Sequence, residues 1–286
     1  MAWREDLMLR AKDIRSLSRE EKLKFLHEIE DSGEWRGDYE EIYVALFDDP
    51  DPEVRQFAVA AFWDFPEEKY VDRLIKKARG DADAQVRAEA SSVLGIYIYE
   101  GFVIEEFSQT QAQKVRRFLL DTVENEKEDP LVRRRALEAV SFDDSEEIFQ
   151  HIDMAYASGD TDWRATAIFC MGRCGNERYS PTILKELDSR DKLHKLEAIG
   201  AAGEAFLATA TPKLRVLAMD RDKDVRLEAI WALSHTAGPG ALESLELCAV
   251  SSDEDVQRVA QEAIEEYRAF YTEEGEEEGD EEDEEA

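Results

Sequence analysis

The sequence lacks the features that membrane spans, secretory leaders and disulfide frameworks require. No uninterrupted apolar stretch is long enough to cross a bilayer, and residues 1–15 mix charged with apolar side chains, unlike a signal peptide. Only three cysteines are present, Cys170, Cys174 and Cys248, and they give no disulfide framework. We therefore expect a protein of the reducing cytoplasm with no membrane insertion.

Positive charge is scarce as well. The chain has 36 basic and 68 acidic residues, for a net charge of −32. Residues 273–286 supply 11 of the acidic side chains, which leaves 57 acidic against 36 basic residues, about −21, for the rest. Such a surface repels phosphate backbones, so nucleic acid is not expected as a partner. The dense like charge of residues 272–286 predicts a disordered acidic tail.

Residues that carry chemistry are few and scattered. Four histidines are spread over the chain, and Cys170 and Cys174 have no second pair at metal-site spacing. Cys170 is expected to pack in the core. We found no phosphate-binding loop and no Gly-x-Ser-x-Gly nucleophile motif. The sequence therefore predicts no catalytic residues, no metal and no cofactor, and the protein is not expected to be an enzyme.

An internal repeat is the strongest pattern present. An aspartate recurs seven times, with steps of 32, 46, 31, 31, 31 and 31 residues, and an alanine follows seven places after each one. The aspartates are Asp51, Asp83, Asp129, Asp160, Asp191, Asp222 and Asp253. Four places after the first six comes a basic residue, namely Arg55, Arg87, Arg133, Arg164, Lys195 and Arg226. Gln257 stands at this position in the last repeat.

Each repeat predicts two helices. The aspartate suits a helix N-cap, and apolar residues three, seven and eleven places later form the buried stripe of an amphipathic helix. Gly172 and Gly203 are predicted to end two of these helices. A second helix precedes each aspartate. Before the repeats, helices are predicted at residues 2–15 and 19–30, which gives capping helices over 1–37, a repeat array over 38–271 and the tail over 272–286.

The segment Asp-Pro-Glu-Val-Arg at 51–55 with Ala58, and the segment 222–226 with Ala229, resemble HEAT repeats. They are most similar to the short, phycobilisome-lyase type of this armadillo-like helical family. The resemblance implies an all-α fold, a right-handed α-solenoid (superhelix) of about seven two-helix repeats. It also implies that the repeated aspartates and basic residues form a structural ladder between repeats, and that the helix after each aspartate lines the concave face.

For function, the resemblance implies a non-enzymatic scaffold or adaptor that binds another protein on the concave face. The alternative, suggested by the repeat type alone, is a bilin lyase or another chromophore-handling protein. HEAT arrays serve many roles, so the fold does not decide between these two.

One step of the repeat is about 14 residues longer than the others, which places an insertion near 96–110. This insertion is rich in aromatic and aliphatic residues, so it is expected to pack against something. Either it lengthens a helix and packs on its own repeat, or it protrudes as a partner contact.

Two further sets of residues are candidates for partner binding. Large apolar residues are predicted on the face opposite the buried stripe, with Gly200 leaving space among them, and they either pack on a neighbouring helix or form a binding patch. They are Trp63, Phe169, Leu196, Leu227 and Trp231. A basic cluster either is a solvated face or binds an acidic segment, and it consists of Lys114, Arg116, Arg117, Arg134 and Arg135.

Overall fold

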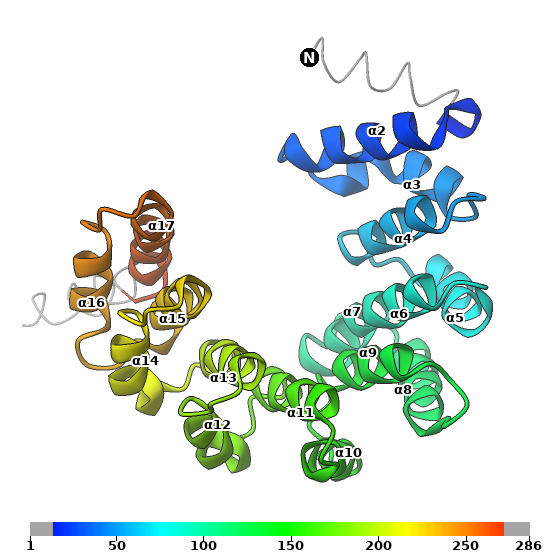
Figure 1. Ribbon diagram of the computed structural model, residues 1–286. Coiled ribbons are helices and arrows are strands. Elements are labelled where there is room, and N and C mark those ends of the chain that lie inside the picture. Colours follow the sequence, from blue (N-terminus) through cyan, green and yellow to red (C-terminus); the bar gives the residue numbers. More distant parts are fainter. Residues whose placement is uncertain (1–13, 272–286) are drawn as a thin grey trace, which may run out of the picture. The chain divides into compact units, whose positions relative to one another are not determined.

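A computed structural model describes residues 14–271, and the fold is all-helical over this range, as predicted. The chain is an α-solenoid whose contacts divide it into two compact units at residue 143 (Figure 1). We call the described residues 14–143 unit 1 and 144–271 unit 2. Most of the predicted helix 2–15 and the whole tail 272–286 lie outside the described residues.

Unit 1 begins with the predicted helix at 19–30, whose Ser18 and Glu21 form the expected capping box. Three helix pairs follow it; short 3₁₀ turns precede the first two pairs, and a short helix with a π-helical turn precedes the third. The helices are α2 (Arg19–Asp31), α3 (Glu40–Leu46), α4 (Pro52–Ala60), α5 (Val71–Gly80), α6 (Ala84–Val93), α7 (Gly95–Ile98), α8 (Gln109–Glu124) and α9 (Pro130–Val140).

Unit 2 consists of four helix pairs, in each of which the second helix follows the repeated aspartate. The second helices α11, α13, α15 and α17 pack side by side in this order. The helices of unit 2 are α10 (Glu146–Ala157), α11 (Thr161–Arg173), α12 (Ser180–Glu186), α13 (Lys192–Glu204), α14 (Thr211–Leu217), α15 (Lys223–Thr236), α16 (Ala241–Cys248) and α17 (Glu254–Tyr271). No helix of the described range is both long and apolar enough to pass through a membrane.

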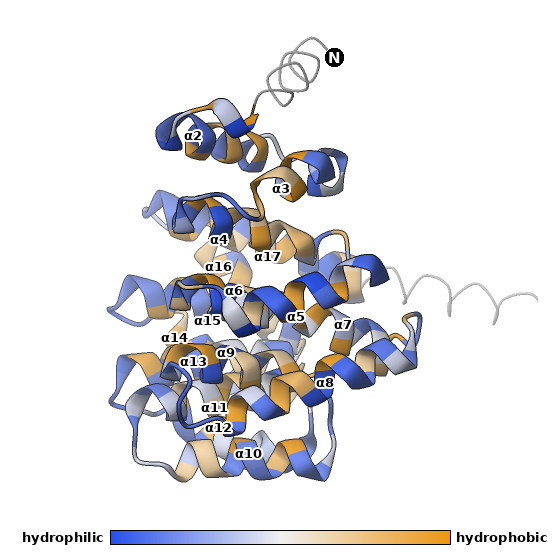
Figure 2. Ribbon diagram, turned by 90° about the vertical axis from the view of Figure 1, so that its right-hand side faces the viewer, coloured by the Kyte–Doolittle hydropathy of each residue, from blue (hydrophilic) through white to orange (hydrophobic). Residues whose placement is uncertain are grey.

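The repeat pattern positions these helices as follows. Asp51 accepts hydrogen bonds from the backbone N–H groups of Glu53 and Val54, at 3.0 and 3.2 Å, and thereby caps α4. The other repeated aspartates cap their helices in the same way. Val54 and Ala58, the first two members of the predicted stripe, are fully buried. Figure 2 shows that polar and apolar residues also alternate along the first helices α5 and α8.

The glycines predicted to end helices have a different role. Gly172 and Gly203 lie inside α11 and α13, which continue to Arg173 and Glu204. A Cβ atom at Gly172 would lie 2.4 Å from the Cα atom of Ala201 in α13. The helices do end within one residue of the predicted positions, but the absent side chains serve close helix packing rather than termination.

The ladder side chains reach acidic residues of the following repeat, and these are mostly not the capping aspartates. Arg55 donates two hydrogen bonds to Asp81, at 2.7 and 2.9 Å, two positions before the cap of α6. Arg87 pairs with Glu128, and Arg164 with Glu186. Arg226 does pair with the next capping aspartate, Asp253, at 3.3 Å. Arg133 donates to the carbonyl of Val123, and Lys195 makes no hydrogen bond or ion pair with any residue of the range 14–271.

Cations at the first position of a helix also contact capping aspartates, as Arg19 does with Asp51 at 3.1 Å. Lys192 pairs with Asp222 at 2.8 Å, and Lys223 pairs with Asp253 at 3.3 Å. The Lys192 hydrogen bond lowers the pKa of Asp222. Adjacent repeats are therefore linked by carboxylates that both cap a helix and bind a cation of the preceding repeat.

Part of the insertion lengthens the helical run after α6 and packs inside unit 1, against α8 and α9 of the following repeat as well as against α6. The chain continues from α6 through α7 into a π-helical turn at Tyr99–Val103. Ile96, Tyr97 and Ile98 are buried, which favours the first of the two interpretations for this part. Val103 and Ile104, at the end of the π-helical turn, remain exposed.

Candidate functional site

A groove of about 310 Å³ lies on the second helices of unit 2, and we call it the unit 2 groove. Three successive second helices, α11, α13 and α15, form it. Three of the predicted apolar residues line it, namely Phe169, Leu196 and Trp231. Each of the three is only partly buried, and each comes from a different repeat. The 31-residue spacing therefore places equivalent helix faces next to one another, as the sequence predicts.

Small residues shape the floor of the groove. Gly200 lines it, and a Cβ atom there would lie 3.2 Å from the Glu228 Oε1 atom. The Trp231 ring lies across Gly203, so that a Cβ atom at Gly203 would be 2.7 Å from it. The absence of side chains at both glycines thus leaves room for the indole and for the groove beside it.

Four carboxylates line the same groove. They are Glu197, Glu204, Asp224 and Glu228. Asp224 is neutralised by Lys192 at 2.7 Å. Burial, and secondarily the charge of Glu204, raise the pKa of Glu228. The groove thus combines an apolar floor with negative charge in a partly buried setting, where charges interact more strongly than in bulk water.

An aromatic ledge continues from Trp231 toward the end of unit 2. The Trp231 ring lies 4.6 Å from the His235 ring, and His235 in turn contacts Phe206 and Phe270 at 5.9 and 6.0 Å. Phe206 is 56% and Phe270 51% exposed. Phe206 also has a positive φ of 48°, a conformation that is uncommon for a residue with a side chain. We call Phe206, His235 and Phe270 the aromatic ledge.

The comparisons with known proteins agree with this architecture. The family described as HEAT repeats matches residues 180–265, which include α13, α15 and most of α17. Residues 180–265 are therefore similar to HEAT repeats, and the α-solenoid fold agrees with that match. None of the curated proteins compared with it matches it.

Two solved structures illustrate the likeness. The complex of CpcE and CpcF of phycocyanin lyase from Nostoc sp. PCC7120 is 18% identical, with a TM-score of 0.52 over 79% of this chain and 86% of that chain. Human deoxyhypusine hydroxylase in complex with glycerol is 14% identical, with a TM-score of 0.41 over 93% of this chain and 96% of that one. At these identities the first likeness concerns the fold alone, and the second carries no further argument.

The remaining predicted apolar residues lie elsewhere in the protein. Leu227 is partly buried on α15 but does not line the groove. Trp63 belongs to unit 1, where its ring lies 6.4 Å from that of Phe142, and Phe142 in turn contacts Tyr99. The structure therefore brings three of the five candidates together and places Trp63 in a separate aromatic cluster.

The predicted basic cluster is largely neutralised within unit 1. Arg116 pairs with Asp143 at 2.5 Å, and Arg135 pairs with Glu138 at 2.6 Å. Arg134 has interactions of its own as well. Lys114 pairs with Asp72 in a second groove, of about 700 Å³, between α5 and α8.

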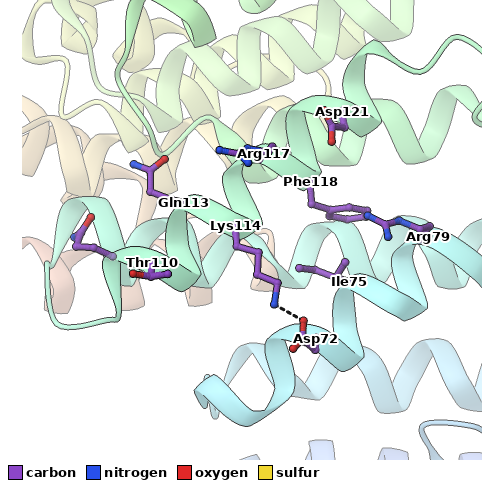
Figure 3. Close-up of a pocket in the computed structure, with 10 residues that line it drawn as sticks. Asp72, Ile75, Arg79, Thr110, Gln113, Lys114, Arg117, Phe118 and Asp121 are labelled. Atoms are coloured by element: carbon purple, nitrogen blue, oxygen red, sulfur yellow. Dashed lines mark hydrogen bonds and ion pairs between the residues drawn. The ribbon is translucent and has the colours of Figure 1, made fainter.

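Figure 3 shows the groove between α5 and α8, with Lys114 directed at Asp72 and Arg79 beside the Phe118 ring. Arg117 also lines this groove and is exposed, with no ion pair to any described residue. Three cations, Arg79, Lys114 and Arg117, and two carboxylates, Asp72 and Asp121, line this groove, so it does not form a strongly basic surface. The residues of the predicted basic cluster stay candidates for binding an acidic segment, with less support than the unit 2 groove has.

The surroundings of the cysteines and of His194 indicate a structural role for these residues. Cys170 is fully buried, and burial raises the pKa of the Cys174 and Cys248 thiols. The His194 Nε2 atom lies 3.0 Å from the carbonyl oxygen of Thr161 in the neighbouring second helix. Within residues 14–271, no group of three or more His, Cys, Asp or Glu side chains is arranged to hold a metal ion.

Proposed function

We propose that this protein is a non-enzymatic, cytoplasmic scaffold that binds a protein partner in the unit 2 groove. The observation that carries the proposal is the alignment of Phe169, Leu196 and Trp231. These large apolar side chains from three successive repeats remain partly exposed in one groove. Partly exposed aromatic residues in a concave site are typical anchors of protein–protein interfaces.

The chemistry of the groove supports binding rather than catalysis. Its lining residues are apolar or carboxylic, and no Ser, Cys, His or Lys is among those that the described residues contribute. A Ser, Cys or Lys nucleophile with a neighbouring histidine base is therefore missing from the lining. Carboxylates around an apolar floor instead suit the recognition of a complementary surface.

The chromophore-handling alternative has weaker support. The phycocyanin lyase complex is similar in fold, but a bilin carries carboxylate groups that the four acidic residues of the groove would repel. A bilin mixed with the purified protein should show no shifted absorption band. A shifted band that Trp231→Ala removes would favour the alternative over the scaffold.

Trp231→Ala tests the proposed function. We expect partner capture from a lysate of the native cell to fall by at least about tenfold, because interface aromatic anchors commonly contribute about 2 kcal/mol or more. The captured proteins are quantified by mass spectrometry for the wild type and the variant. The far-ultraviolet circular dichroism and the melting temperature of the variant show whether it is folded.

The matched control is Trp63→Ala, which removes a partly buried tryptophan from unit 1. We expect this control to retain the captured protein. If both variants capture the same proteins in the same amounts as the wild type, the unit 2 groove is not the binding site.

A further inference from the structure

Two carboxylates at the unit 2 groove have no counter-charge. Glu204 and Glu228 make no hydrogen bond or ion pair with any residue in the range 14–271. Asp224, in contrast, is paired with Lys192. Burial and repulsion from Glu204 act together to raise the pKa of Glu228, so its charged form is disfavoured in the free protein. A cation bound beside these carboxylates would offset both the cost of burying the Glu228 charge and its repulsion from Glu204.

The two rings of the groove differ in whether a cation already covers them. The Arg173 guanidinium lies over the Phe169 ring, 4.3 Å from its centroid. Trp231 has no such cation among the described residues. Because indole is the best of the aromatic side chains at attracting a cation, Trp231 is an unused cation–π site directly beside unneutralised carboxylates.

The size of the groove limits what enters it. A volume of about 310 Å³ is at the lower end of the range for ligand sites, and it suits one long side chain. The exposed rings of Phe206 and Phe270 both contact His235, whose ring also contacts Trp231. They offer apolar surface to a neighbouring residue of the same segment.

On the basis of the proposed function, we propose that the occupant of the unit 2 groove is a basic segment of a partner protein. An Arg or Lys side chain of this segment enters the groove between Glu204 and Glu228 and lies against the Trp231 ring. An adjacent apolar side chain packs on the aromatic ledge. The same charges exclude acidic peptides and nucleic acid from this groove.

The test uses three fluorescein-labelled synthetic peptides of equal length and the full-length protein. The first peptide repeats Arg-Leu-Gly-Ser, the second Glu-Leu-Gly-Ser and the third Arg-Ser-Gly-Ser. Binding is measured by fluorescence anisotropy at an ionic strength of about 0.15 M, where long-range attraction between exposed charges is largely screened. We expect the Arg-Leu peptide to bind most tightly, the Arg-Ser peptide more weakly, and the Glu-Leu peptide not at all.

Isosteric variants distinguish a specific contact in the groove from the general electrostatic attraction between an acidic protein and a basic peptide. Glu204→Gln with Glu228→Gln should weaken Arg-Leu binding by about tenfold, a change of about 1.4 kcal/mol. Glu177→Gln with Glu243→Gln removes the same two charges from exposed positions that precede or lie on first helices of unit 2. This control should change the affinity by less than twofold.

The outcomes are decisive in both directions. The inference is overturned if the Arg-Leu peptide fails to bind at millimolar protein, if the Glu-Leu peptide binds as well, or if both double variants weaken binding equally. If Trp231→Ala still abolishes capture of the native partner in any of those cases, the proposed function stands and only the chemistry assigned to the partner fails. If Trp231→Ala leaves native capture unchanged, the proposed function itself fails.

Discussion

The two units share one repeat but present different side chains on their second helices. One and five places after the ladder position, unit 1 has small or polar residues, namely Gln56, Ala60, Ala88, Ser92, Arg134 and Glu138. The first three repeats of unit 2 have mainly apolar ones at the same places, namely Ala165, Phe169, Leu196, Gly200, Leu227 and Trp231. The buried stripe is therefore the part of the repeat that determines the fold, while these two positions vary with the surface that each unit presents.

The carboxylates of the two faces differ in the same way. In unit 1, Glu89 accepts a hydrogen bond from the Gln56 amide at 3.3 Å, and Glu138 is paired with Arg135. In unit 2, Glu228 occupies the position equivalent to Glu89 but has no such partner within the described range. The face of unit 1 satisfies its own polar groups, whereas that of unit 2 leaves a carboxylate available to a ligand.

The largest expected effect concerns helix packing. Gly172→Ala should destabilise unit 2 by about 1–3 kcal/mol, because the new Cβ atom would meet the Ala201 backbone at 2.4 Å and force α11 and α13 apart. In unit 1, Gly95→Ala meets the Ala139 Cα atom at 3.1 Å and should have a smaller effect. Urea denaturation measures both, and an equal loss in the two variants would show that the packing distances do not decide the outcome.

The caps give a second comparison. Asp83→Ala in unit 1 removes a helix cap that has no ion pair, so we expect a loss of about 1 kcal/mol. Asp222→Ala in unit 2 removes a cap together with the Lys192 contact and should lower stability more.

The acid dependence of the two cap variants identifies the source of the difference. Since Lys192 lowers the pKa of Asp222 in the folded protein, its contribution is present above the ordinary pKa of 3.8 and is lost as the pH falls through the folded value. The difference in the free energy of unfolding between the Asp83→Ala and Asp222→Ala variants should therefore become smaller in acid. A gap that is the same at neutral and acid pH would argue against the ion pair as its source.

Glu228→Gln should raise the stability of the free protein at neutral pH. The pKa of Glu228 is raised on folding, so the ionised carboxylate disfavours the folded state once the pH exceeds the folded value. The advantage of the Gln variant should shrink as the pH falls toward the ordinary value of 4.5. Glu89→Gln at the equivalent position of unit 1 should bring no such gain. Thermal melts between neutral and acid pH compare the two, and a destabilised Glu228→Gln would refute the account of this carboxylate.

Much of the fold could be predicted because every repeat has the same capping and buried positions. Asp at the cap, Ala seven places later and apolar residues between them are enough to place all seven second helices. The partner of each ladder cation could not be predicted, since Asp81, Glu128 and Glu186 stand at different offsets from the next cap. The π-helical turn at Tyr99–Val103 was not predicted either, because an insertion has no counterpart in the other repeats.

For the candidate site, the apolar floor was predicted and its acidic lining was missed. Glu197 and Glu228 both stand two places after the ladder position, a recurrence that was visible in the sequence. These glutamates come to line the same groove as the apolar residues because α13 and α15 pack side by side, which the sequence does not show. The aromatic ledge has no sequence signal, because Phe206 and Phe270 come from ends of helices that the repeat pattern does not align.

Site-specific photo-crosslinking in the native cell tests the central claim most directly. A benzophenone amino acid is placed at Leu196 in the unit 2 groove or, in a separate strain, at Gln56, the equivalent position of unit 1. The proposed function predicts a discrete crosslinked partner protein from position 196 and none from position 56. The same product from both positions, or a product from position 56 alone, would contradict it.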